Sequence, residues 1–200
     1  MNDIKEMKLY SNAHRIFNDL KALGYAEEDE LKLEDVNQFD QLHYHGTLSV
    51  QEAIESINIQ ENDNVLEVGA GWGGPSRYIA YKTRANVSAL ELQQDYSEVG
   101  KELTLKTGLE SFVTHINEDF LNYSQKDTCF DKIVSWLALY HIPNRKKYTE
   151  KLFNLLNKKG MLFIEDLTFG SGFESSHKEM LEKKLFANSL EKYSDYLDSC

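Results

Sequence analysis

The sequence is poor in cysteine and proline and contains no long apolar run. Cys129 and Cys200 are the only cysteines among 200 residues, so we expect no disulfide framework and a reducing compartment. The first ten residues, MNDIKEMKLY, lack the apolar core of a signal peptide. No apolar run approaches the ~18 residues that a membrane-spanning helix needs. These absences predict a cytoplasmic protein.

Positive charge is also scarce, with 22 Lys and Arg against 33 Asp and Glu and a net charge of −11. This balance argues against nucleic acid or an anionic membrane as partner, since both require clustered basic residues. The most acidic stretch, AEEDELKLED at 26–35, is interpreted as a solvated connecting segment rather than as a docking site for a basic partner.

Helical periodicity dominates residues 1–60, where we predict a helical cap without strands. The stretches 10–24 and 48–59 place apolar residues at helical spacing. Between them, the aromatic and histidine-rich stretch NQFDQLHYHGT at 37–47 is predicted to be a loop.

The period changes at residue 64, where a second domain, predicted over 61–200, begins. Short apolar runs alternate with helix-compatible stretches, which predicts βαβ units and a doubly wound, Rossmann-like α/β fold with a parallel sheet. The expected strands are 64–69, 85–92, 111–118, 130–139 and 160–167, the helices between them are 75–83, 94–107 and 145–157, and two further helices are expected at 173–186 and 189–200.

A glycine-rich turn, GAGWGG at 69–74, follows the first predicted strand. Gly69, Gly71 and Gly74 satisfy the dinucleotide fingerprint, whereas Gly69, Gly71 and Gly73 satisfy the GxGxG turn of nucleoside-methionine sites. A purely structural tight turn is the third interpretation. The turn alone does not decide between them.

Acidic residues near the expected carboxyl ends of the strands are more informative. Glu67 precedes the turn by two residues, where a carboxylate would repel a pyrophosphate but suits a cofactor that carries an ammonium group. Glu91 ends the next strand and can accept hydrogen bonds from both ribose hydroxyls. After the third strand, Asp119 can receive an exocyclic amine and Phe120 can line a base.

With these motifs in order, residues 36–170 resemble the class I S-adenosylmethionine-dependent methyltransferases. The matching pieces are VLEVGAGWGG, VSALEL, NEDF, FDKIVSWLALYHIPN and LLNKKGMLFIEDL. The resemblance implies S-adenosylmethionine as cofactor, glycines against its methionine portion, Glu91 at the ribose, Asp119 at the adenine amine and two residues that flank the base. The complete expected set is Glu67, Gly69, Gly71, Gly73, Glu91, Leu92, Asp119, Phe120 and Trp136.

Within this class, FDQLHYHGTLSVQEAI leading into GGPSRYIA is similar to small-molecule N-methyltransferases that act on sarcosine, dimethylglycine or phosphoethanolamine. The phosphoethanolamine enzymes carry an aspartate four residues before the equivalent of His141, where this chain has Leu137. Trp136 and Tyr140 suggest a less polar or quaternising amine, although core packing explains both equally well. The acceptor class therefore stays open.

An amine acceptor must lose a proton before or as it attacks, and His141 is the candidate base. The alternative is that His141 packs the junction between strand and helix. Tyr44 is the candidate for a hydroxyl near the transferring methyl group or a π-face for a cation. His43 and His45 make a poor metal site, so no metal is expected. His115 is expected at the surface or on a helix face, as are His14 and His177.

The resemblance also implies an antiparallel hairpin at the end of the sheet, and we expect this hairpin to be missing here. An uncovered edge strand invites pairing with another chain, so a homodimer, an inactive paralogue and a fragment are the three hypotheses. Two other functions are open: a nicotinamide-dependent oxidoreductase, and a methyltransferase-like protein that binds a partner without catalysis.

Overall fold

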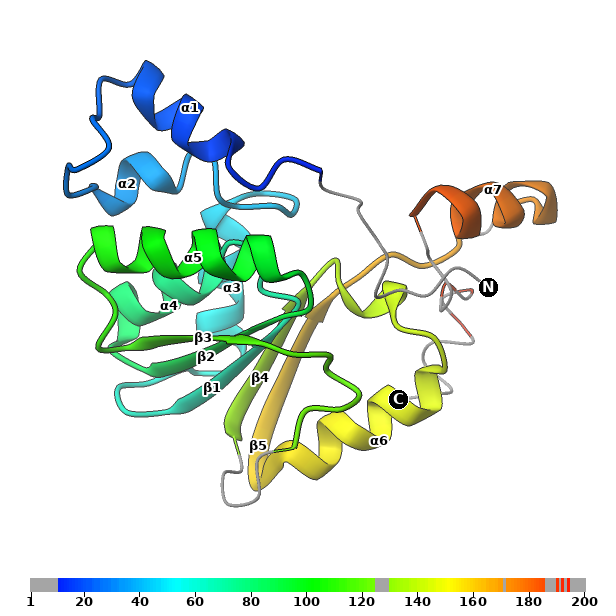
Figure 1. Ribbon diagram of the computed structural model, residues 1–200. Helices are drawn as coiled ribbons and strands as arrows, with labels where there is room; N and C mark the ends of the chain where they lie inside the picture. Colours follow the sequence, from blue (N-terminus) through cyan, green and yellow to red (C-terminus); the bar gives the residue numbers. More distant parts are fainter. Residues whose placement is uncertain are drawn as a thin grey trace.

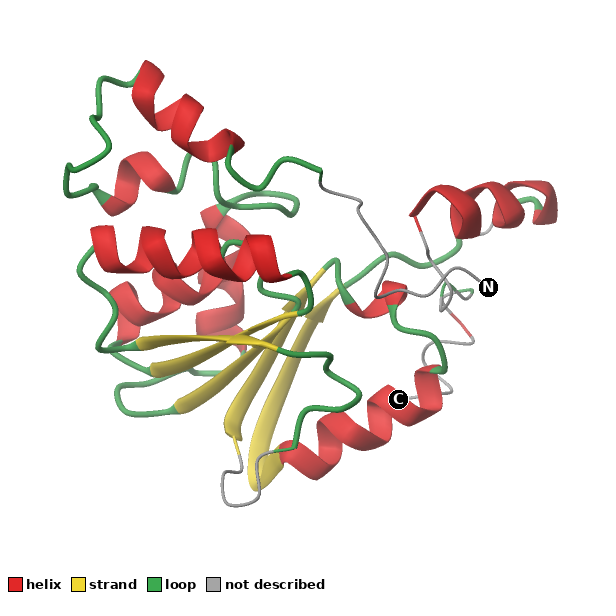
Figure 2. Ribbon diagram, in the orientation of Figure 1, coloured by secondary structure: helices red, strands yellow, loops and turns green. Residues whose placement is uncertain are grey.

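A five-stranded parallel sheet with helices on both faces forms the centre of the computed structural model, which describes residues 11–124, 130–170, 172–185, 190, 192 and 194 (Figures 1 and 2). The strand order is β3-β2-β1-β4-β5. The strands are β1 (Asn64–Val68), β2 (Asn86–Glu91), β3 (Val113–Asn117), β4 (Phe130–Trp136) and β5 (Leu156–Glu165). The predicted α/β fold with a parallel sheet is confirmed.

The chain order reverses at β1, because β2 and β3 lie on one side of it and β4 and β5 on the other. The crossover helices α4 (Gly74–Thr83) and α5 (Gln94–Lys106) therefore cover one face, and α6 (Arg145–Leu155) covers the opposite face (Figure 1). Ligands of doubly wound sheets bind outside the carboxyl ends of the strands at such a reversal. The topology thus places a candidate site between the ends of β1 and β4.

Burial on both faces explains the apolar run of the central strand β1, in which every residue after Asn64 is buried. In β1, Val65 and Leu66 are fully buried on opposite faces of the sheet. Strand β5 begins earlier than predicted, at Leu156, and the pairing with β4 shifts register between Phe130 and Lys132. The preceding helix α6 correspondingly ends at Leu155 rather than at 157.

The N-terminal residues form three helices, α1 (Arg15–Ala22), α2 (Leu33–Val36) and α3 (Thr47–Ser56). The segment at 26–35, interpreted as a solvated connection, is exposed or half-buried except at Leu31 and Leu33, which are buried. The backbone N–H of Leu31 donates to the carbonyl of Lys106 at 2.8 Å. Leu31, Val36 and Ile16 pack with Leu103 of α5. The N-terminal helices are therefore anchored on the sheet domain; their standing as a separate domain stays a prediction.

Beyond the sheet, α7 (Ser175–Leu185) occupies the first predicted tail helix, and the second, at 189–200, lies almost entirely outside the described residues. In the described ranges no strand pairs with the outer edge of β5. The missing hairpin and the homodimer stay predictions. None of the helices in the described part of the chain has the length and apolarity required to cross a bilayer.

Candidate functional site

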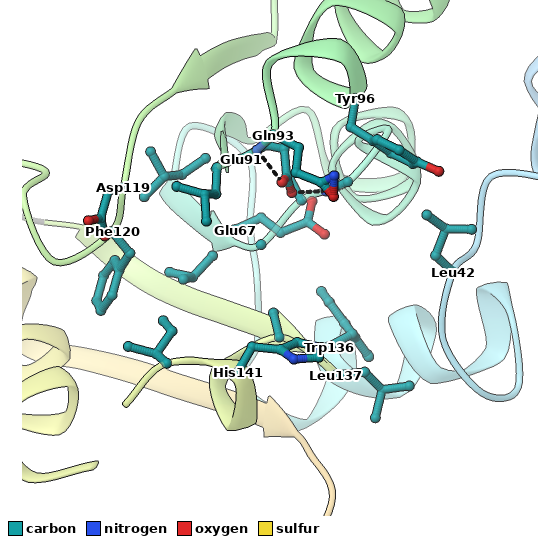
Figure 3. A pocket seen from close by; sticks show the side chains of 18 of the residues that line it. Leu42, Glu67, Glu91, Gln93, Tyr96, Asp119, Phe120, Trp136, Leu137 and His141 are labelled. Carbon is teal, nitrogen blue, oxygen red and sulfur yellow. Dashed lines mark hydrogen bonds between the residues drawn. The ribbon is translucent and has the colours of Figure 1, made fainter. Parts of the chain in front are cut away.

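A cavity of about 320 Å³ opens where the topology predicts it, at the carboxyl ends of β1, β2, β3 and β4 (Figure 3). Its wall comes largely from the carboxyl ends of these strands, from the turns that follow them, and from Asp40, Leu42 and His43 of the N-terminal region. Asp119 and Phe120 lie at one side of the cavity and Leu42 at the other (Figure 3). Segments far apart in the sequence therefore enclose one space.

The glycine turn adopts the left-handed backbone conformation that glycine permits, with φ values of 77° at Gly69, 54° at Gly71 and 75° at Gly73. Gly69 and Gly71 line the cavity. A Cβ at Gly69 would overlap the side chain of Ala138, which follows β4. Gly73 lies outside the described cavity wall, where a Cβ would come within 2.6 Å of the His115 ring. Two of the three predicted glycines thus face the cavity.

Glu91 is fixed at the cavity by the backbone of two neighbouring turns (Figure 3). Its Oε2 accepts a hydrogen bond from Gly71 N–H at 2.7 Å, and its Oε1 accepts one from Gln93 N–H at 2.8 Å. Burial raises the pKa of the Glu91 carboxyl, and the two backbone donors oppose that rise. The residue joins the glycine turn to the end of β2.

Glu67 lines the cavity but is only 2% exposed, and its Oε2 accepts a hydrogen bond from the Ser76 hydroxyl at the start of α4. Burial raises the pKa of Glu67 to about 8. Its carboxyl is therefore largely protonated at pH 7. The expectation of a full negative charge beside the turn needs correction, because the surrounding apolar strands desolvate the group.

The residues predicted to hold a nucleoside are brought together by adjacent strands. Leu92 follows β2, Asp119 and Phe120 follow β3, and all three line the cavity. Asp119 is held in its turn by the backbone N–H of Leu121, which donates to Oδ1 at 2.9 Å. Their contacts with a ligand stay predictions.

The opposite wall is mainly apolar. It includes Trp136 at the end of β4, then Leu137 and Ala138, and His141 in the 3-10 turn Leu139–His141. His141 is 8% exposed. Tyr44, the candidate for a hydroxyl near the transferring methyl group or a π-face for a cation, is 60% exposed and lies outside the described lining residues, so the structure does not bring it to the cavity.

His43, the residue before Tyr44, faces the cavity instead. It lines the cavity, and its ring stacks on Trp136 with centroids 5.4 Å apart and planes 30° apart. Burial lowers the pKa of His43. The aromatic and histidine-rich sequence at 37–47 indicated that this loop could form part of a wall. Because loop residues have no periodicity, the sequence does not predict which of its side chains faces the cavity.

His115 is a second residue whose predicted place was wrong. It lies on β3 behind the glycine turn, with Nε2 2.8 Å from the Thr104 hydroxyl of α5. Burial lowers its pKa to about 3. Gly73 and Gly100 leave the space for its ring, because a Cβ on either would lie within 2.8 Å of it. The histidine is thus a neutral packing residue that supports the turn.

Comparisons with known proteins agree with this architecture. A family model described as mycolic acid cyclopropane synthetase matches residues 37–193. A glycine/sarcosine/dimethylglycine N-methyltransferase from Actinopolyspora halophila is 27% identical over 118 residues, which cover 59% of this chain and 21% of that protein. A sterol 24-C-methyltransferase from Eremothecium gossypii is 30% identical over 122 residues, or 60% of this chain and 32% of that protein.

Among solved structures, Haemonchus contortus phosphoethanolamine N-methyltransferase 2 in complex with S-adenosyl-L-methionine superposes with a TM-score of 0.78 at 17% identity. The superposition covers 100% of this chain and 43% of that chain. The chain thus spans less than half the length of each of these three proteins. At this identity the structural likeness establishes the fold.

Proposed function

The chain belongs to the mycolic acid cyclopropane synthetase family, and on that premise we propose that it binds S-adenosylmethionine in the central cavity and transfers the methyl group to a small-molecule acceptor, an amine. The observation that carries the proposal is the meeting of the glycine turn, Glu91, and the Asp119–Phe120 pair around one cavity. Solved relatives of the same fold bound to this cofactor or its product support the proposal.

The charge of the cavity wall supports a cationic cofactor. Five acidic residues line it, and none of the described lining residues is Lys or Arg; the five are Asp40, Glu67, Glu91, Glu118 and Asp119. Asp40 is paired with Arg77 and the Glu67 carboxyl is largely protonated, so the negative charge of the wall comes from Glu91, Glu118 and Asp119. A pyrophosphate would meet these carboxylates without a cationic lining residue, whereas a sulfonium and an ammonium group find compatible surroundings. The wall therefore disfavours the nicotinamide-dependent oxidoreductase.

The role that we propose for Glu91 on the nucleoside side of the cavity follows from the carboxylate lone pairs that the backbone hydrogen bonds leave available. Each carboxylate oxygen of Glu91 accepts one backbone hydrogen bond, which leaves lone pairs that can accept from ribose hydroxyls. Leu92 and Phe120 supply apolar surface for the two faces of a base, and the Asp119 carboxylate lies where an exocyclic amine would donate.

On the acceptor side, the residues position a nucleophile and exclude water. The cofactor, when bound, supplies an electrophilic methyl group, so the protein contributes mainly alignment and desolvation. We assign His141 as the base that takes the proton of an amine acceptor, because it lies on the wall beside Leu137 and Ala138. The apolar character of this wall favours an amine without further charged groups.

Calorimetric titration of the purified chain with S-adenosylhomocysteine tests the cofactor site. We expect micromolar binding that Glu91→Ala weakens at least tenfold, which is ~1.4 kcal/mol. Glu102→Ala, which removes a carboxylate from the exposed face of α5, is the matched control and should bind as wild type does. Tight binding of NAD without binding of S-adenosylhomocysteine would reject the proposal.

A further inference from the structure

A buried ion pair joins the N-terminal region to the start of α4 beside the cavity. Arg77 Nη2 lies 2.8 Å from Asp40 Oδ2, and both side chains are fully buried. Asp40 itself lines the cavity. Burial raises the pKa of Asp40, and the adjacent guanidinium opposes that rise.

Arg77 connects three parts of the structure through its other terminal nitrogen. Nη1 donates to the carbonyl of Trp72 in the glycine turn at 2.7 Å, and to the carbonyl of Gly100 and the hydroxyl of Thr104 in α5, each at 3.1 Å. The guanidinium is planar and its donors are fixed relative to one another. With Asp40 as the remaining partner, the arginine fixes residues 40–43 relative to both the turn and α5.

Residues 40–43, which we name the wall segment, lie directly against the glycine turn. A Cβ at Gly74 would overlap the backbone oxygen of Asp40 and come within 2.7 Å of Gln41 Nε2. A Cβ at Gly71 would come within 3.3 Å of Leu42. The contact is therefore close at two points, and it depends on two missing side chains as well as on the ion pair.

The wall segment continues the connection to the acceptor side. Gln41 Nε2 donates to Asp40 Oδ1 at 2.8 Å, and Gln41 Oε1 lies 3.0 Å from His43 Nε2. His43 in turn stacks on Trp136. A continuous series of contacts thus leads from Arg77 to the indole that lines the opposite wall.

We propose that Arg77 and Asp40 are positioning residues, which hold the wall segment against the glycine turn and thereby set both the cofactor affinity of the cavity and the placement of His43 on Trp136. The inference rests on the proposed function for its affinity part. A buried ion pair contributes little net stability compared with an apolar pair of similar volume. Its directional bonds, in contrast, fix one geometry, and that geometry completes the cavity.

Two variants test the inference by different physical routes. Arg77→Met combined with Asp40→Leu removes both charges, so that no unpaired charge remains buried and the chain can fold. Gly74→Ala leaves the ion pair chemically intact and does not require a left-handed backbone, but its methyl group displaces the wall segment. The matched control is Lys146→Met with Glu150→Gln, an exposed pair on α6.

We expect both test variants to bind S-adenosylhomocysteine at least tenfold more weakly than wild type, while the control binds normally. Arg77→Lys, which keeps the charge but loses the planar set of donors, should bind with intermediate affinity. In a Trp72→Phe background, which leaves Trp136 as the only tryptophan, the emission of Trp136 should change in both test variants, because the stacked imidazole moves. Circular dichroism and melting temperature establish that each variant is folded.

The outcomes separate the two proposals. A folded wild type that binds no S-adenosylhomocysteine overturns the proposed function together with the affinity part of this inference. Wild-type binding that persists unchanged in both folded test variants overturns the affinity part alone. Unchanged fluorescence emission of Trp136 in both variants overturns the proposal that the ion pair sets the placement of His43. This measurement requires no ligand.

Discussion

At the scale of single residues, burial decides the chemistry of the carboxyl groups around the cavity. The sequence places Glu67 beside the glycine turn correctly, but it does not reveal that the side chain is 2% exposed. The Ser76 hydroxyl donates a hydrogen bond to this side chain, and the surrounding strands exclude solvent from it. Glu67 and Glu91 line one cavity, and the backbone N–H groups of Gly71 and Gln93 favour the charged form of Glu91. The hydrogen bonds from Ser76 favour the charged form of Glu67 as well, but burial outweighs them.

Glu67 predicts a specific dependence of stability on pH. Because its pKa rises to about 8 in the folded state, the folded protein keeps a proton that the unfolded chain loses above about pH 4.5. The free energy of unfolding should therefore fall as the pH rises from 5 to 8, by up to about 1.4 kcal/mol per unit.

Glu67→Gln keeps an acceptor for Ser76 and removes this contribution. The free energy of unfolding of the variant, relative to that of wild type, should therefore increase as the pH rises. Urea unfolding at pH 5, 6, 7 and 8 measures the difference. Glu102→Gln on the exposed face of α5 should retain the wild-type slope. Parallel curves for Glu67→Gln and wild type would show that Glu67 is ionised in the folded protein.

His141 carries the prediction for catalysis. His141→Ala should lower the rate of methyl transfer by about 10²–10⁴-fold at unchanged affinity for S-adenosylhomocysteine, since a base contributes to the transfer rather than to cofactor binding. Tyr44→Phe is the comparison, and we expect a rate within twofold of wild type because Tyr44 is exposed. Transfer of labelled methyl groups to a panel of amines measures both. Equal rates for wild type and His141→Ala would assign His141 to packing.

At the scale of elements, the glycine turn depends on its contact with the loop after β4. Gly69→Ala should lower the free energy of unfolding by about 2–4 kcal/mol, because the new methyl group overlaps Ala138 and the backbone must keep a φ of 77°. In Gly69→Ala combined with Ala138→Gly the overlap disappears, and a loss of about 1–2 kcal/mol should remain.

Chemical denaturation of the two single variants and the double variant gives the coupling between turn and loop. Additive losses would contradict the contact, since independent sites do not rescue one another. A double variant that is more stable than Gly69→Ala alone would establish that the two elements share one packing space at the edge of the cavity.

At the scale of the whole molecule, the sequence predicts the features that depend on local patterns. The strands contain short apolar runs, and the glycine turn consists of adjacent residues, so both could be placed from the sequence alone. Glu91, Leu92 and Asp119 could be brought together because parallel strands end at one edge of a sheet.

Features that depend on contacts between distant segments could not be predicted. His115 reads as a surface residue in a short strand, and its place behind the turn follows only from the packing of β3 against Gly73 and Gly100. Arg77 reads as an ordinary helix residue, and its partner Asp40 lies 37 positions away in a loop. The burial of Leu31 in an acidic stretch has the same origin, since α5 supplies its environment.

The connection between Asp40, Arg77 and α5 has a consequence for the order in which the molecule is assembled. During synthesis the wall segment leaves the ribosome before the arginine that holds it, and that arginine precedes its own partners Gly100 and Thr104. A nascent chain that ends before α5 therefore contains the ion pair but lacks the two partners in α5 that complete the hydrogen bonds of Arg77. The wall segment is therefore synthesised before the residues that hold it in place, and its position depends on segments translated later.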